Sequence, residues 1–199
     1  MVTQTIRKPR ADMLRNRALI LETAQRHFLQ QGVNTSLDAI AKEAGVGPGT
    51  LYRHFPTRDG LLAAVLQTRA DELTQRQAAA EELSDPSEAL HAWLHALEDY
   101  LNSFSGLPEP LMAAARASEP ENPLTLPCTE LIATTGEFLH AAQKAGAARP
   151  EVGGRALFLA AAALAWVRGS NSPDDAALAG LRRLLAHGYE VGPCQEDTP

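Results

Sequence analysis

Residues 35–62 constrain the fold more than any other stretch, because two short helical patterns stand there on either side of a turn. The first pattern repeats apolar residues at helical spacing: Leu37, Ile40, Ala41 and Ala44. Gly45 can take the left-handed conformation that ends a helix, and Pro48 clashes with any helix that runs into it. Proline is tolerated at the first helical position, so the pattern predicts a second helix from Pro48 to Phe55.

The two predicted helices are amphipathic. Thr35 and Asp38 have the spacing of a capping box, which predicts that Thr35 caps the first helix. In the second helix, Leu51 and Phe55 are predicted to face inward. The outward residues carry groups that can donate to phosphate or to base edges: Thr50, Tyr52, Arg53 and His54. Two short helices joined by a glycine-containing turn are typical of a helix-turn-helix, whose second helix enters the major groove of DNA.

Further residues make this pattern specific. Within the stretch stand Ala44-Gly45-Val46, Gly49-Thr50-Leu51-Tyr52, His54-Phe55, Arg58 and Leu61-Leu62. Upstream stand Arg15-Asn16-Arg17, Ile20-Leu21, Ala24, Phe28-Leu29 and Gln31-Gly32. Together these residues resemble the signature of the tetracycline-repressor (TetR) family of bacterial regulators, over the first third of the chain.

The resemblance implies a set of DNA contacts. At positions matching Thr50, Tyr52 and His54 the family contacts phosphate, and Arg58 resembles a basic residue that holds a phosphate together with a helix N-terminus. Gly47 stands where family members often have a capping serine, and glycine caps acceptably. The full set of candidate DNA-binding residues is Arg15, Arg17, Thr35, Lys42, Pro48, Gly49, Thr50, Tyr52, Arg53, His54 and Arg58.

The distribution of charge agrees with a DNA-binding end. The whole chain has a formal net charge of -6, which by itself argues against a nucleic-acid partner. Residues 1–60, however, carry nine Lys and Arg against five Asp and Glu, and the remainder carries nine against nineteen. A basic N-terminal segment on an acidic body suits a protein that touches phosphate with one end only.

Helical patterns recur through most of the 199-residue chain, and no sustained strand alternation appears, which predicts an all-α protein. Residues 1–9 are interpreted as a flexible basic arm, followed by a helix at 11–31. Thr57 is predicted to cap a long helix that reaches Leu83. Five more helices are expected, at 87–104, 109–117, 129–144, 150–168 and 174–187, with a proline-punctuated loop at 118–127 and a frayed end at 192–199. The predicted organisation is a helix-turn-helix DNA-binding domain (1–60), a connecting helix (61–83) and a larger effector-binding and dimerisation domain (84–199).

The resemblance also implies what the C-terminal part does. In that family the last two helices pair with a second subunit, and a cavity in the same domain binds an effector. The run ALFLAAAALAWV at 156–167 is apolar nearly all round, which independently favours a partner subunit as its cover. Aromatic and methionine side chains could line the cavity, although such residues at helical spacing are often plain core. The candidates are Trp93, Tyr100, Phe104, Met112, Phe138, Phe158 and Trp166.

Other classes of protein have little support. Cys128 and Cys194 have no metal-type spacing and indicate no disulfide framework. His91 and His95 lie one turn apart and could share a metal, but the sequence HAWLH lacks the glutamate of zinc proteases, and we expect no metal. Neither a nucleophile elbow nor a cofactor fingerprint is present, so we expect no enzyme and no cofactor. The chain has no apolar run that indicates a signal peptide or a membrane span, which predicts a soluble cytoplasmic protein with no membrane partner.

The sequence therefore predicts a homodimeric transcription regulator. Its partners are double-stranded DNA with a roughly palindromic operator and a small-molecule effector, and the expected action is repression that the effector relieves. The alternative is a helical ligand-binding or protein-interaction module that does not read DNA specifically.

Overall fold

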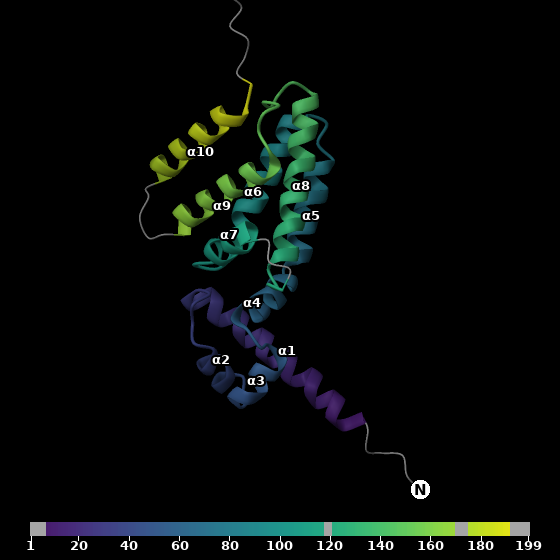
Figure 1. Cartoon of the computed structure of the whole chain (residues 1–199), viewed down its shortest axis with the longest axis vertical. Helices are drawn as coiled ribbons and strands as arrows, with labels where there is room; N and C mark the ends of the chain where they lie inside the picture. Colours follow the sequence, from purple (N-terminus) through teal and green to yellow (C-terminus); the bar gives the residue numbers. More distant parts are fainter. Residues whose placement is uncertain (1–6, 118–120, 170–174, 192–199) are drawn as a thin grey trace, which may run out of the picture.

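The computed structural model describes residues 7–117, 121–169 and 175–191. Figure 1 shows α1, α2 and α3 at one end of the molecule, with α4 leading into a larger group formed by α5 to α10. The helices are α1 (Arg7–Gln31), α2 (Leu37–Glu43), α3 (Pro48–His54), α4 (Arg58–Gln67), α5 (Ala70–Glu81), α6 (Pro86–Leu101), α7 (Pro108–Ala117), α8 (Thr125–Lys144), α9 (Gly154–Gly169) and α10 (Asp175–Tyr189). The predicted fold class, an N-terminal helix-turn-helix domain with a larger C-terminal helical domain, is confirmed.

The first helix is longer than predicted, and its buried face matches the predicted apolar pattern only in part. It begins at Arg7, so residues 7–9 are helical rather than a flexible arm, while residues 1–6 lie outside the described part. The apolar residues at helical spacing are Leu14, Ala18, Leu21, Ala24 and Phe28, which predicts that they face inward, but Leu14 is 58% exposed. Ile20, Ala24 and Phe28 are fully buried at intervals of four residues, as one helical face requires. The reason is geometric: the beginning of α1 projects past α3, so only its second half is covered (Figure 1).

The predicted single helix from Arg58 to Leu83 is wrong, because it divides at Thr68 and Arg69 into α4 and α5. Both backbone N–H groups bond to carbonyls three residues back, Thr68 to Val65 at 3.1 Å and Arg69 to Leu66 at 3.0 Å, which tightens the last turn. The Arg69 guanidinium lies 5.7 Å from the centre of the Phe104 ring and pairs with Glu72 at 3.2 Å. These contacts fix the bend between the two helices.

The C-terminal helices pack around α6, whose Leu90, Trp93, Leu97 and Leu101 are buried. Four boundaries here differ from prediction by two residues or more, the first being the end of α6, which lies at Leu101 rather than 104. The α8 helix begins at Thr125 rather than 129, with Pro127 in its first turn, where proline is tolerated. The α9 helix begins at Gly154 rather than 150, and α10 ends at Tyr189 rather than 187. The predicted loop at 118–127 is thus shorter. Residues 118–120 and the expected frayed end at 192–199 lie outside the described ranges.

Two loops join the N-terminal helices to the larger group. The Phe28 and Phe104 rings meet edge to face with centroids 5.8 Å apart, and the Val33 N–H donates to the Ser105 carbonyl at 2.9 Å. Gly32 has a φ of +81°, and a Cβ added to it would lie 2.8 Å from that same carbonyl oxygen. A side chain at residue 32 would therefore be strained and would separate the two loops. Within the described ranges, no helix combines the length and the apolar character that crossing a bilayer requires.

Candidate nucleic-acid interface

The start of α2 differs from prediction in one residue. Ser36 rather than Thr35 caps the helix, since its hydroxyl accepts the Ala39 N–H at 3.3 Å. Thr35 is buried, donates its hydroxyl proton to Gln31 Oε1 at 2.8 Å and lies 3.4 Å from His27 Nδ1. The predicted capping box is therefore wrong, because the end of α1 supplies Thr35 with other partners. Its side chain belongs to the wall between α1 and α2.

The turn between α2 and α3 is formed as predicted. Gly45 has a φ of +70°, in the left-handed region that favours glycine. The N–H groups of Gly45 and Val46 bond back to the Lys42 and Ala41 carbonyls at 3.2 and 3.0 Å, which satisfies the open end of α2. Gly47 then caps α3 with its backbone alone, and Pro48 occupies the first turn.

Two buried side chains pack α3 against the rest of the domain and so determine which of its faces is exposed. Leu51 and Phe55 are 0% and 4% exposed, so both predicted inward residues are confirmed. An adjacent side of the helix carries Tyr52, which is 45% exposed and whose hydroxyl bonds to no described residue. A phenol in this position can donate to a phosphate oxygen or to a base edge.

The other polar residues of α3 are less free than the sequence suggested. Arg53 is exposed but folds along its own helix, with Nε donating to the Gly49 carbonyl at 3.1 Å and Nη2 donating to Thr50 Oγ1 at 3.0 Å. His54 is half-buried, with its ring 6.3 Å from that of Phe55. Pro48 and Gly49 are exposed at the beginning of the helix.

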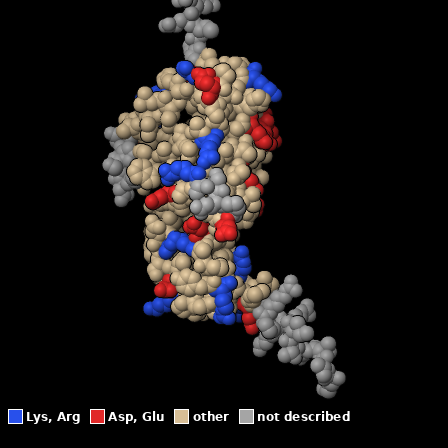
Figure 2. Space-filling view, viewed as in Figure 1, with Lys and Arg blue, Asp and Glu red and all other residues tan. Residues whose placement is uncertain are grey.

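The neighbouring helices α1 and α2 also carry exposed basic side chains, and one of them reaches α3. The Arg17 guanidinium lies 4.9 Å from the centre of the Phe55 ring, which places this α1 residue at the end of α3. Arg15 and Lys42 are exposed, and neither forms an ion pair with any described residue. Glu43, which follows Lys42 in the sequence, has other partners: it pairs with Arg26 at 3.2 Å and with His27 at 2.7 Å. Figure 2 shows Lys and Arg side chains over this lower end of the molecule, with some acidic ones between them.

Arg58 has a role that the sequence did not reveal. Its Nη1 donates to the Val33 carbonyl at 2.6 Å and to the Thr35 carbonyl at 2.7 Å, so it ties the start of α4 to the loop between α1 and α2. Thr57 caps α4 as predicted and accepts the Gly60 N–H at 3.0 Å. The partners of Arg58 are backbone atoms 25 and 23 residues away, for which sequence patterns carry no signal.

A cavity of about 160 Å³ lies where α4 and α5 meet α6 and α8. Two of the seven candidate ligand-binding residues, Trp93 and Tyr100, line it. Burial raises the pKa of the Tyr100 phenol to about 12, so this group remains a neutral donor at physiological pH. The Trp93 indole N–H donates to Thr135 Oγ1 at 3.0 Å. The remaining lining residues are Ala63, Leu66, Gln67, Ala70, Leu73, Thr74, Gln77, Pro127, Glu130, Leu131 and Thr134.

The other five candidates do not line this cavity. Phe138 stacks on the ring of Trp93 at a centroid distance of 5.5 Å, and Phe158 is fully buried in the core. Phe104 packs between the two domains against Phe28. Met112 is half-buried in α7, whereas Trp166 is 53% exposed on α9. Sequence spacing alone could not distinguish these surroundings.

The two histidines of α6 have different surroundings. His91 Nε2 lies 2.6 Å from an oxygen of Glu190, the residue that follows α10. His95 is exposed. Among the described residues, no three His, Cys, Asp or Glu side chains gather in a way that could hold a metal ion.

Comparison with known sequences accounts for both domains. Residues 20–65 match the family described as bacterial regulatory proteins of the tetR family, and residues 85–190 match the SbtR-like C-terminal domain of transcriptional regulators. The chain belongs to the TetR family. The second match spans more than half of the chain, and the first contains the whole helix-turn-helix. TetR-family proteins are bacterial DNA-binding transcriptional regulators.

Curated relatives of this TetR-family protein match about a third of the chain. An HTH-type transcriptional regulator of Staphylococcus aureus strain bovine RF122 / ET3-1 (SAB2452) is 48% identical over 59 residues, which is 29% of this chain and 32% of that protein. A second one, SAUSA300_2515 of strain USA300, is 46% identical over 63 residues. The similarity thus spans about a third of the length of these relatives.

Solved structures are similar over most of the chain. The TetR transcriptional regulator SCO0520 of Streptomyces coelicolor is 31% identical, with a TM-score of 0.56, over 89% of this chain and 99% of that one. AibR, solved in complex with isovaleryl coenzyme A and operator DNA, is 19% identical with a TM-score of 0.58, over 87% of this chain and 97% of its own. At that identity the likeness to AibR concerns the fold alone.

Proposed function

We propose that this TetR-family protein is a cytoplasmic repressor, without enzymatic activity, that binds a roughly palindromic operator as a homodimer and is released by a small-molecule effector. The observation that carries the proposal is the outer face of α3. Leu51 and Phe55 are buried beneath this helix, Tyr52 is exposed on it, and the Arg17 guanidinium lies against the Phe55 ring at its end. A recognition helix with flanking cations is the arrangement that helix-turn-helix proteins place in the major groove.

The surroundings of the candidate residues indicate a different role for each group. Arg15, Arg17 and Lys42 contact phosphates, because they are exposed cations of the helix-turn-helix domain. Tyr52 donates to a phosphate, and Arg53 and Thr50 read bases once Arg53 leaves its intrahelical bonds. Arg58 and Thr35 support the interface from behind rather than touching DNA, since their donors are directed at atoms of the protein.

The dimer forms through α9 and α10. On these helices Trp166 is 53% exposed and Leu184 is 72% exposed, and exposed apolar surface of this kind is where protein partners bind. Of the residues in α10, only Leu178 and Tyr189 are buried. A second copy of the same helices supplies the cover and sets the spacing of the two recognition helices, which matches one helical turn of DNA.

The effector binds in the cavity that Trp93 and Tyr100 line. That cavity lies against the bend between α4 and α5, so a ligand there bears on the helix that leads to the DNA-binding domain. Suppose that the ligand binds more tightly to the dimer whose two DNA-binding domains are wrongly spaced for the operator. By linkage, the ligand then lowers the affinity for DNA by the same factor by which DNA lowers the affinity for the ligand, commonly about 1–3 kcal/mol of coupling.

Selection on random duplexes tests the proposal. The purified protein is incubated with a pool of random double-stranded DNA, and bound duplexes are amplified and sequenced over several rounds. Enrichment of a palindrome with two half-sites about one helical turn apart is the expected result. A folded dimer that enriches no sequence would contradict the proposal and favour a ligand-binding or protein-interaction module.

A further inference from the structure

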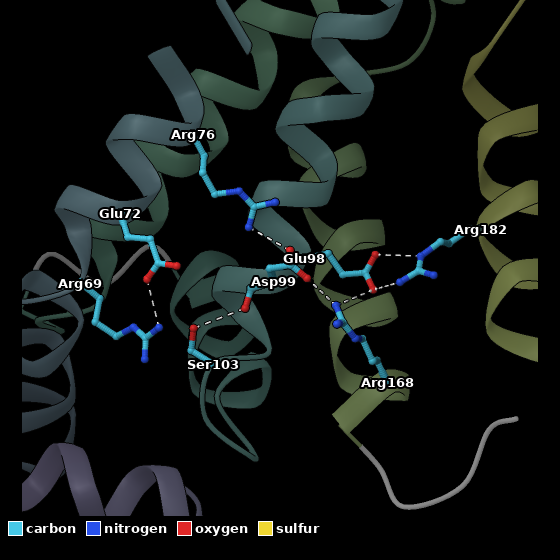
Figure 3. Close-up of polar contacts among 8 residues, drawn as sticks. All are labelled: Arg69, Glu72, Arg76, Glu98, Asp99, Ser103, Arg168 and Arg182. Atoms are coloured by element: carbon cyan, nitrogen blue, oxygen red, sulfur yellow. Dashed lines mark hydrogen bonds and ion pairs between the residues drawn. The ribbon is translucent and has the colours of Figure 1, made fainter. Parts of the chain in front are cut away.

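A second cavity, separate from the proposed effector site, lies between α6, α9 and α10 and has a volume of about 190 Å³. Two polar contacts mark its ends. At one end Arg182 of α10 donates to Glu98 of α6, with Nε 3.0 Å from Oε2 (Figure 3). At the other end His91 Nε2 lies 2.6 Å from Glu190 Oε1. Glu98 follows His91 by seven residues on α6, so the two contacts are about 10 Å apart along the helix.

Between these ends the wall is mostly aliphatic. Its apolar residues are Leu94 on α6, Leu157, Ala160, Ala161 and Leu164 on α9, and Leu185 and Ala186 on α10. The alanines leave space that larger side chains would occupy, and well-packed interiors contain few voids larger than a water molecule. An aliphatic cavity of about 150 Å³ in another protein holds benzene. This cavity has room for a single ring or a branched chain of similar size.

The polar groups on the wall are mainly donors. Both oxygens of Glu98 accept from Arg182, and Arg168 also lies 3.6 Å from one of them, so this carboxylate has little capacity left for a ligand. Arg183 and His95 also line the cavity, are exposed, and bond to no residue in the described ranges. A ligand therefore meets an aliphatic surface with a guanidinium and an imidazole at its opening.

We propose that this cavity binds a small amphipathic carboxylate, such as an aromatic or branched short-chain acid. The apolar part lies against Leu157, Ala161 and Leu164, and the carboxylate faces Arg183 and His95. A carboxylate is the best partner for a guanidinium, which can donate two parallel N–H bonds to it. This binding does not depend on the proposed reading of DNA, and it uses a site distinct from the one that Tyr100 lines.

Calorimetric titration of the full-length protein with benzoate tests the proposal, with benzyl alcohol and benzylamine as neutral and cationic probes of the same shape. We expect saturable binding of benzoate in the high-micromolar to millimolar range, as suits a ligand of so few atoms. Benzyl alcohol should bind several-fold more weakly, and benzylamine should bind least. Absence of saturable benzoate binding, or tighter binding of benzylamine, would overturn the proposal.

Variants locate the binding site. Ala160→Leu fills the cavity from a half-buried position and should abolish benzoate binding, whereas Ala70→Leu, which fills the other cavity, should leave it unchanged. Arg183→Gln should weaken binding several-fold. The matched control is Arg116→Gln, an exposed arginine on α7, which should have no effect. Benzoate binding that survives Ala160→Leu in a folded protein would place the ligand elsewhere and contradict the assignment.

Discussion

Arg182 of α10 and Glu98 of α6 form a two-point ion pair, in which Nε and Nη2 donate to the two carboxylate oxygens at 3.0 and 2.5 Å. The Glu98 side chain is only 4% exposed, so its charge depends on this pairing. Figure 3 shows how the contact continues: Arg168 of α9 reaches both Glu98 and Asp99, and Arg76 of α5 binds Asp99 at 2.9 Å. One charged cluster therefore joins four helices of the C-terminal domain.

Removing the cation from this pair should destabilise the protein. Arg182→Met leaves a buried carboxylate with only Arg168 nearby, and we expect a loss of about 1–3 kcal/mol in the free energy of unfolding. Urea denaturation measures it. The matched control is Arg183→Met, the adjacent exposed arginine without an ion pair among the described residues, which should change stability by about 0.5 kcal/mol or less. Equal effects of the two variants would mean that the pair contributes nothing.

Arg58 should be a stability residue rather than a DNA contact. Arg58→Met leaves the Val33 and Thr35 carbonyls without their donor, and we expect a loss of about 1–3 kcal/mol in urea denaturation. Arg53→Met, in which an exposed arginine loses only bonds within α3, is the control and should be close to neutral in stability. A stable Arg58→Met protein that had lost only DNA affinity would instead support a phosphate contact.

These two residues illustrate what the sequence could and could not predict. The helix-turn-helix was predictable because its determinants are local: Gly45 must end α2, Pro48 can begin α3, and Thr57 can cap α4. The contacts of Arg58 and of Arg182 join segments 23 to 84 residues apart, and side-chain patterns say nothing about such pairings.

Local signals also failed where a distant segment intervened. Thr35 and Ser36 are both good helix caps, and the choice between them depended on Gln31 and His27 of the preceding helix. The break at Thr68 and Arg69 contains no glycine or proline, and its position reflects the contact of Arg69 with Phe104. Of the candidate ligand-binding aromatic residues, only tertiary packing separates Tyr100, beside a cavity, from Phe158, in the solid core.

The Cys128 thiol should be unreactive in the native protein. Burial raises its pKa from 9.0 to about 12, so the reactive thiolate is suppressed about a thousandfold at pH 8 relative to an ordinary thiol. In a Cys194→Ser variant, which isolates this thiol, we expect labelling with a disulfide reagent to be at least about a hundredfold slower in buffer than in urea. Similar rates in the two conditions would show that Cys128 is accessible.

The exposed apolar residues of α9 and α10 should hold the dimer together. Leu184→Glu places a charge on a side chain that is 72% exposed in one copy, so it should barely change the fold of the monomer. In the dimer that charge would be buried, and sedimentation should detect monomers at concentrations where the wild type is dimeric. Leu126→Glu, a 67% exposed leucine on α8, is the control and should remain dimeric. Retention of the dimer by Leu184→Glu would move the interface away from this face.

Two substitutions separate charge from hydrogen bonding at the DNA interface. Lys42→Gln removes a phosphate-directed cation, so it should weaken binding to every duplex and reduce the slope of log K against log salt by about one. Tyr52→Phe removes only a neutral donor and should cost about 1 kcal/mol in binding free energy with little change in slope. Anisotropy titrations at several salt concentrations distinguish the two. Variants indistinguishable from wild type would exclude these residues from the interface.

Sequence-specific DNA binding is the central claim, and one titration tests it most directly. The wild-type protein is titrated by fluorescence anisotropy against a selected palindromic duplex and against a shuffled duplex of the same composition, at one near-physiological salt concentration. We predict that the palindrome binds tighter by about a thousandfold or more, the range of specific over non-specific binding. Equal affinities for the two duplexes, from a folded and dimeric sample, would contradict the account.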